Sequence, residues 1–258
     1  MTTPRLVLHQ FRYDQKTFWR NPAAVFFTVA LPLIFLFIFV SIFGNDETEV
    51  RGRTIEGSAY YVPGIIVLGL VSATTVNLSI TLATLRERGI LKRVRSTPLP
   101  PWVYMAGRIL TSTITMFLLT AVVMVLGKLV YDVEIPVDTL PALVLTLIVG
   151  TFCFCALGFA LTAAVPSEEA APAVANAVVL PMYFFSGIFI PEQDLPSGMR
   201  LLGDIFPVKH LFNAVLAAFD PFTTGSGIEG GDLGVLALWG LVGLLIASRV
   251  FRWSPKGI

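Results

Sequence analysis

The chain has 258 residues, of which 55% are hydrophobic and only 14% charged, and its mean hydropathy is +0.78. Soluble domains carry about 25% charged residues, so a chain of this length and composition is excluded from the soluble globular class. It is predicted to be an all-α membrane protein, because helices satisfy their own backbone hydrogen bonds in lipid. The formal net charge of +1 gives no sign of a nucleic-acid partner, and none is expected.

Residues 1–22 predict a helix that lies flat in the headgroup region. On a helical wheel, one arc carries large apolar side chains with only Gln15 as a polar exception: Val7, Leu8, Phe11, Phe18 and Trp19. Another arc carries basic side chains: Arg5, His9, Arg12, Lys16 and Arg20. Separate apolar and basic arcs are typical of an interfacial helix. Asn21-Pro22 ends this helix, and residues 23–258 are predicted to form the transmembrane domain.

Six apolar runs follow, and each approaches or passes the length of about twenty residues that spans a bilayer core. They cover residues 23–43, 60–84, 103–127, 140–165, 172–190 and 233–251. Lys and Arg resist translocation, so the side of the membrane where they gather is cytoplasmic. One set of connections holds most of them: Arg5, Arg12, Lys16, Arg20, Arg86, Arg88, Lys92, Arg93, Arg95, Arg249, Arg252 and Lys256. The opposite set holds only Arg51, Arg53, Lys128, Arg200 and Lys209. Six spans with both termini in the cytoplasm satisfy this bias.

Residues 191–231 are predicted to form an external cap rather than a seventh crossing. Pro207 interrupts the apolar stretch 205–219, and only about a dozen residues remain before Asp220-Pro221. This length suits a re-entrant helical hairpin.

The segment RERGILKRVRS, residues 86–96, is the densest cluster of charge in the chain and lies between two apolar runs. Ile90, Leu91 and Val94 fall on one side of a short helix, and Arg88, Lys92 and Arg95 gather on another. The prolines of STPLPP stop this helix sharply. Two interpretations remain open at this point: a simple topology signal, or a contact with another protein.

Two motifs resemble the permeases of type-2 ABC exporters. Residues 82–110 resemble the first cytoplasmic loop of these permeases at Arg86, Glu87, Arg88, Gly89, Leu91, Arg93, Thr97 and Pro98, although a Glu is common where Arg86 stands. Residues 183–215 are similar to the signature after the fifth span at Ser186, Gly187, Pro191, Leu195, Pro196, Pro207 and His210. Drug-resistance permeases of the daunorubicin-exporter kind look most similar, and the resemblance covers nearly the whole chain.

The resemblance implies that residues 86–97 are a coupling helix seated on a separate ATP-binding cassette subunit in the cytoplasm. The contact residues would be Arg86, Glu87, Arg88, Gly89, Ile90, Leu91, Lys92 and Arg93. Glu168 and Glu169 in the loop 165–173 either add a second contact or form a solvated turn. It also implies an inner-membrane location and a second permease copy, as a homodimer or with a sister permease.

The chain itself is expected to be no enzyme and to hold no cofactor or metal. The sequence contains no G-x-x-x-x-G-K-[ST], no H-E-x-x-H and no G-x-S-x-G. ATP and Mg²⁺ would therefore be bound by the partner subunit.

Polar residues inside the spans are candidates for a pathway that carries an amphiphilic drug, lipid or natural product. Thr74, Asn77 and Thr81 form a stripe on the second span, and Asn176 and Tyr183 lie seven apart on the fifth. The alternative is that these side chains form hydrogen bonds between packed helices. For the whole chain, the alternative function is a non-transporting assembly or sensor protein that scaffolds a cytoplasmic partner.

Overall fold

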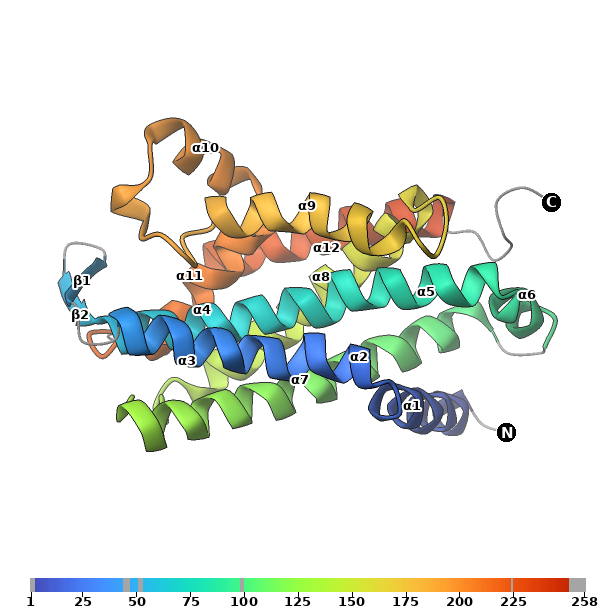
Figure 1. The fold of residues 1–258 in the computed structure, drawn as a ribbon, viewed down its shortest axis with the longest axis horizontal. Helices are drawn as coiled ribbons and strands as arrows, with labels where there is room; N and C mark the ends of the chain where they lie inside the picture. The colour runs from blue at the N-terminus through green and yellow to red at the C-terminus, as the bar shows by residue number, and fades with distance from the viewer. Residues whose placement is uncertain (1–2, 44–46, 51–52, 98–99, 224, 251–258) are drawn as a thin grey trace.

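The computed structural model describes residues 3–43, 47–50, 53–97, 100–223 and 225–250. Four residues used above lie outside this description: Arg51, Pro98, Arg252 and Lys256. The described chain folds into a bundle of long helices that run side by side (Figure 1). A two-stranded antiparallel sheet, β1 (Glu47–Val50) and β2 (Arg53–Glu56), lies between the first two helical segments. The all-α prediction missed this hairpin, which is short and carries charged residues in both strands.

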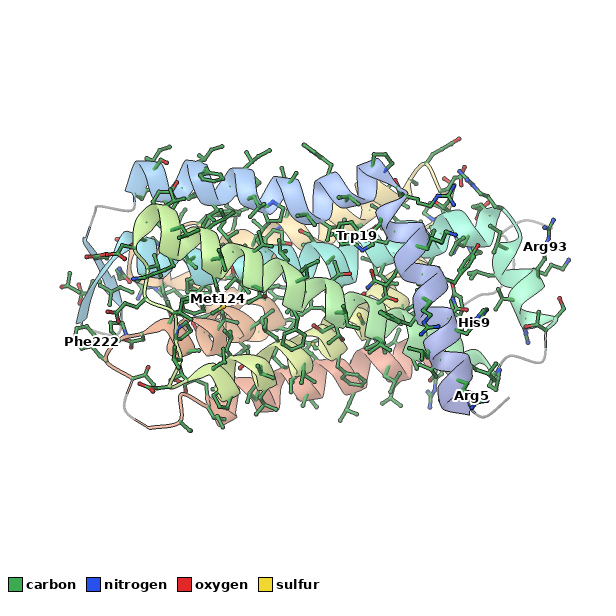
Figure 2. The ribbon with its side chains drawn as sticks, turned by 90° about the horizontal axis from the view of Figure 1, so that it is seen from below. Arg5, His9, Trp19, Arg93, Met124 and Phe222 are labelled. Atoms are coloured by element: carbon green, nitrogen blue, oxygen red, sulfur yellow. The ribbon has the colours of Figure 1, made fainter. Side chains whose placement is uncertain are left out.

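α1 (Thr3–Trp19) lies across one end of the bundle, roughly perpendicular to the long helices (Figure 2). It packs against the beginning of α7 (Pro101–Tyr131). A Cβ atom at Gly107 of α7 would come within 2.6 Å of Cγ of Gln10. Glycine at this position is therefore what allows α1 to approach α7 so closely.

The first two apolar runs each contain one widened, π-helical turn. The first run comprises α2 (Pro22–Val25), η1 (Phe26–Ala30) and α3 (Leu31–Phe43). The second comprises α4 (Gly57–Val71), η2 (Ser72–Val76) and α5 (Asn77–Glu87). At the end of η1 the Leu31 N–H bonds the Phe26 carbonyl, and the next residue, Pro32, has no N–H to give. π-Turns of this kind occur frequently at functional sites.

Within the described residues, four helices are long and apolar enough to cross a membrane: Gly57–Glu87, Trp102–Tyr131, Leu140–Ala164 and Gly230–Val250. The last two of these are α8 and α12. The first and fifth predicted spans fold as shorter apolar helices, Thr28–Phe43 and Ala171–Phe185, the second of which is α9. The chain is thus a helical, multi-pass membrane protein with at least four segments of spanning length.

The region 191–231 contains η3 (Glu192–Asp194), α10 (Ser197–Ile205) and α11 (Pro207–Phe219). α10 and α11 meet at an angle of 90°, because the residue before Pro207 takes an extended conformation. α11 is buried along almost its whole length against α4, α8 and α12. An external re-entrant helical hairpin was predicted here, and a helix pair bent this sharply is either a re-entrant loop or one broken span.

The core is centred on α4, whose residues are buried on every side. A helix that is apolar all round is expected to be surrounded by other helices. α8 approaches η2 so closely that a Cβ at Gly158 would lie 2.6 Å from the Thr74 carbonyl oxygen. α6 (Ile90–Arg95) and α1 lie at one end of the bundle, and the β-hairpin and α10 lie at the other (Figure 1).

Candidate functional site

A left-handed glycine redirects the chain between α5 and α6. Gly89 has φ of +67°, a conformation that costs a residue with a Cβ atom about 1–2 kcal/mol. The turn brings Leu91 completely inside, where it packs with Leu82, Tyr104 and Phe159. The opposite side of the segment is exposed at Arg88, Ile90, Lys92, Arg93 and Arg95. We call these five side chains the α6 face; Arg93 marks it at the end of the bundle in Figure 2.

The side chain of Arg86 is completely buried beneath this face. Its guanidinium donates to the carbonyl oxygens of Thr162 at 3.0 Å and Val165 at 2.8 Å, which end α8. It also pairs with Glu87 at 3.3 Å. Carbonyls at a helix C-terminus lack partners within the helix, so Arg86 satisfies two of them and ties the α5–α6 turn to α8. Among the predicted contact residues, Arg86 and Leu91 thus lie inside the chain and support the α6 face from below.

The second loop, 165–173, lies beside the α6 face. Arg88 Nε is 3.4 Å from Oε2 of Glu168, and Glu169 is exposed. The Ser167 side chain accepts a hydrogen bond from the Ala170 N–H at 3.3 Å, as expected for a capped turn. The basic α6 face is therefore bordered by the acidic side chains of the second loop, Glu168 and Glu169.

The five candidate pathway residues do not come together. Thr74 is buried and donates to the Leu70 carbonyl at 2.6 Å. The Tyr183 hydroxyl donates to the Leu68 carbonyl at 3.1 Å, and Asn176 lies exposed on α9. The Tyr183 bond joins α9 to α4, as helix packing requires, whereas the Thr74 bond returns to a carbonyl four residues earlier in its own helix.

Asn77 and Thr81 lie instead on a small cavity beneath α1. Thr81 donates to Oδ1 of Asn77 at 3.3 Å, and Asn77 donates to Oγ1 of Thr28 at 3.3 Å. The cavity has a volume of about 70 Å³ and lies between α1, η1, α5 and α7. Its polar lining includes Asp14, Thr28, Asn77, Thr81, Arg108 and Thr115. We call it the α1 cavity.

Asp14 lines this cavity and was not predicted as a site residue. It lies three residues from Phe11 and four from Phe18, so it belongs to the apolar arc that was described with Gln15 as its only polar member. Its side chain has no exposed surface; Oδ1 accepts from Gln10 at 3.0 Å and lies 3.4 Å from Arg108 Nη2. Oδ2 has no hydrogen-bond partner within the described part of the chain. Burial raises the pKa of the Asp14 carboxyl above its ordinary 3.8, although Arg108 and the Gln10 hydrogen bond oppose this shift.

Arg108 lies in the first turns of α7, and its side chain is only 11% exposed. The guanidinium turns inward, donates to the Tyr104 hydroxyl at 3.1 Å and faces Asp14. An acid on the apolar arc of a basic helix, and an arginine in the first turns of a span, were the available signals for this pair.

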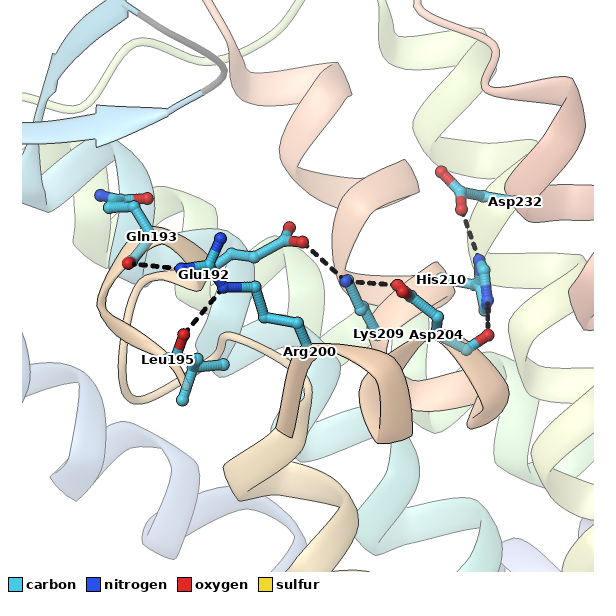
Figure 3. A network of polar contacts seen from close by, with 8 residues as sticks. All are labelled: Glu192, Gln193, Leu195, Arg200, Asp204, Lys209, His210 and Asp232. Carbon is cyan, nitrogen blue, oxygen red and sulfur yellow. Dashed lines mark hydrogen bonds and ion pairs between the residues drawn. The ribbon is translucent and has the colours of Figure 1, made fainter. Parts of the chain in front are cut away.

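At the opposite end, a polar network fastens α10 and η3 to α11 and α12 (Figure 3). Lys209 Nζ donates to Oε1 of Glu192 at 2.8 Å and to Oδ1 of Asp204 at 2.5 Å. His210 Nδ1 lies 2.6 Å from Oδ1 of Asp232, and its Nε2 lies 2.9 Å from the Asp204 carbonyl. Arg200 donates to two carbonyls of the η3 loop. His210 therefore connects α11, on which it lies, to α10 and α12.

These features define a class: a helical, multi-pass membrane protein with a flat terminal helix and a short basic helix at the same end. Residues 6–219 match the family model of the ABC-2 type transporter, and the chain belongs to that family. It is therefore a transmembrane subunit of an ABC transporter, as the two sequence motifs predicted.

Individual relatives have low sequence identity to this chain but match most of its length. The chain is 27% identical over 197 residues to the daunorubicin resistance ABC transporter permease protein DrrB1 of Streptomyces coeruleorubidus, covering 75% of this chain and 67% of the relative. It is 21% identical over 197 residues to a Bacillus subtilis (strain 168) protein with the provisional name of transport permease YvfS, covering 76% and 78%. A provisionally named multidrug ABC transporter permease, YbhR of Escherichia coli K12, is 20% identical over 169 residues, covering 64% and 46%.

Proposed function

We propose that this chain is the permease of an exporter that moves an amphiphilic substrate outward, using ATP hydrolysed on a separate cytoplasmic subunit. The names of the relatives, which include a daunorubicin resistance permease and a multidrug permease, support a drug-like or lipid-like substrate. The observation that carries the proposal is the α6 face, because it offers a protein partner a surface that is both charged and firmly held.

The α6 face combines four cations with one exposed apolar side chain, Ile90. A partner with an acidic rim around an apolar depression would match it in charge and shape. The face rests on Leu91 in the core and on the Arg86 hydrogen bonds to α8. A push on α6 would therefore reach α5 and α8 directly. The ATP and Mg²⁺ would belong to the partner, and Glu168 and Glu169 would border the contact.

The proposed arrangement has six spans, with the shorter apolar helices Thr28–Phe43 and Ala171–Phe185 as the first and fifth. Both termini and α6 would lie in the cytoplasm, α1 in the inner headgroup region, and the α10–α11 pair would re-enter the membrane from outside. A second permease copy would complete the pathway, as a homodimer or with a sister permease.

Copurification with the cognate ATP-binding subunit tests the proposal. The double substitution Lys92→Glu with Arg93→Glu reverses two charges on exposed side chains and leaves Leu91 and Arg86 in place. We expect it to abolish copurification and the ATPase stimulation by the permease, because like charges now face the partner. Lys128→Glu, at the other end of the bundle, is the matched control and should leave association intact.

Two results would contradict the proposal. Association that survives the double charge reversal would remove α6 as the contact. Association without substrate-dependent ATP hydrolysis or export, in vesicles that hold both subunits, would favour the scaffold alternative.

A further inference from the structure

The α1 cavity contains a hydrogen-bond acceptor for which the described residues supply no donor. The Asp14 side chain is completely buried, yet its Oδ2 has no hydrogen-bond partner among the described residues. Buried polar atoms in native proteins are nearly always paired, and those that are not call for an explanation such as a bound water or ligand. Burial also raises the pKa of this carboxyl, which indicates that its negative charge is incompletely compensated.

The lining favours a ligand that donates hydrogen bonds and carries positive charge. Besides the carboxylate, the walls supply hydroxyl groups from Thr28, Thr81 and Thr115 and the amide of Asn77. Arg108, the only cation that the described residues place in the lining, already faces Oδ1 of Asp14 and the Tyr104 hydroxyl. A carboxylate can accept from two cations at once, because it has about four lone-pair positions. An anion would meet the same carboxylate and be repelled.

The size of the cavity limits what enters it. Its volume is about 70 Å³, whereas a single water needs roughly 10–15 Å³ of such space. The cavity therefore has room for a small polar head such as an ammonium group, whereas pockets that enclose a drug-sized ligand measure about 300–1,000 Å³. α1 supplies one wall, with Phe18 beside Asp14, so the apolar part of an amphiphile would remain outside in the interfacial layer along α1.

The two π-turns meet at this site. Thr28 lies in η1, Asn77 directly follows η2, and the two side chains are hydrogen-bonded across the gap. A ligand held here would thus contact both widened turns, and α5 leads directly from the cavity to the turn before α6.

We propose that the α1 cavity binds the ammonium head of an amphiphilic organic cation that enters from the cytoplasmic leaflet, with Asp14 as its principal acceptor. This inference rests on the proposed function, since it names the class of substrate and its first binding site.

Binding of three dansyl probes to the full-length permease in nanodiscs of zwitterionic lipid tests the inference. Dansylcadaverine carries a primary ammonium, dansylamide is neutral and dansylglycine is an anion, so the fluorophore is the same while the charge changes. Fluorescence anisotropy is corrected with empty nanodiscs. We expect saturable binding of dansylcadaverine alone, and Asp14→Asn should weaken it about tenfold or more, since a hydrogen bond between charged groups is lost.

Asp138→Asn, the same substitution at an exposed position of the opposite end, should leave binding unchanged. Thr115→Val keeps the shape of the lining and removes a hydroxyl group, so it should weaken binding severalfold even where Asp14→Asn fails to fold. Equal binding of dansylcadaverine and dansylamide would mean that the ammonium charge is not recognised and would overturn the inference. Tighter binding of dansylglycine would overturn it in favour of an anion site at Arg108.

The proposed function fails separately from this inference. The probes are measured on the permease alone, whereas the α6 test measures its association with the ATP-binding subunit. If dansylcadaverine binding depends on Asp14 but no ATP-binding subunit associates, the proposed exporter function is contradicted and the proposed amine site still stands. An active exporter whose amine binding ignores Asp14→Asn and Thr115→Val would contradict the site alone.

Discussion

Arg86 shows how one side chain can join two loops that are far apart in sequence. Its planar guanidinium reaches the Thr162 and Val165 carbonyls together, which a single ammonium group cannot reproduce. We expect Arg86→Lys to lower the free energy of unfolding by about 1.5–3 kcal/mol, the usual contribution of a hydrogen bond to a charged group. The measurement is the apparent unfolding midpoint of the purified permease in detergent.

Arg93→Lys is the control for this substitution, because Arg93 is exposed on the α6 face. Its unfolding midpoint should stay at the wild-type value. An Arg86→Lys variant as stable as the wild type would show that these hydrogen bonds contribute little, and that packing alone holds the α5–α6 turn on α8.

Asp14 gives the stability of the protein a dependence on pH whose sign is fixed. Its carboxyl has a higher pKa in the folded chain than the ordinary 3.8, so the folded state holds the proton more tightly than the unfolded state. The contribution of Asp14 to stability is therefore most favourable below pH 3.8 and declines as pH rises through the folded pKa. Asn cannot titrate, so the stability of wild type minus that of Asp14→Asn should fall as pH rises from 3.8 toward 8.

Unfolding midpoints of both proteins across this range provide the measurement. The charged and titratable groups that interact with Asp14 are Arg108 and Tyr104 on α7, and neither changes charge in this window. A difference between the two proteins that stays constant, or grows with pH, would mean that burial does not dominate at this carboxyl.

At the scale of elements, the turn at Gly89 determines where α6 points. Ala at this position must adopt φ of +67°, although no neighbouring atom obstructs its Cβ. We expect Gly89→Ala to destabilise the turn by about 1–2 kcal/mol and to weaken binding of the ATP-binding subunit, which copurification measures. Gly198→Ala is the matched control, because that glycine is helical, has no positive φ and has open space around its Cβ. Equal behaviour of the two variants would contradict a role for the turn.

The elements that could be predicted from sequence are those with strong local signals. α7, α8 and α12 have long apolar runs, and α1 separates apolar from basic residues. Pro207 indicated the break between α10 and α11. The β-hairpin has only four residues in each strand, and the π-turns depend on packing between segments, so none of these was visible in the residue pattern.

The candidate site could be predicted only in part, for a similar reason. The motif located α6, but a motif cannot tell exposed from buried members, and Arg86 and Leu91 proved to be buried. Asn77 and Thr81 were selected as polar residues in a span, and their neighbours in the α1 cavity come from helices distant in sequence. The pairing of Asp14 with Arg108 joins residues 94 positions apart, which one sequence does not reveal.

At the scale of the whole molecule, the proposed topology assigns the two ends of the bundle to opposite sides of the membrane. Ser96 lies exposed just after α6, and Asp138 lies exposed in the loop between α7 and α8 at the other end. The native thiols, Cys153 and Cys155, are buried and should give little background with an impermeant maleimide. In intact spheroplasts we expect Asp138→Cys to be labelled and Ser96→Cys to be labelled only after permeabilisation, with the unmodified chain as the control.

This experiment tests the basis on which the α6 face was assigned to a cytoplasmic partner. The positive-inside bias and the family resemblance both orient α6 toward the ATP-binding subunit, and α1 and α6 share one end of the bundle. Labelling of Ser96→Cys in intact spheroplasts would place α6 outside the cell, where it could not contact a cytoplasmic ATP-binding subunit. It would also place the α1 cavity in the outer leaflet, so one labelling pattern decides whether either site can receive its proposed partner.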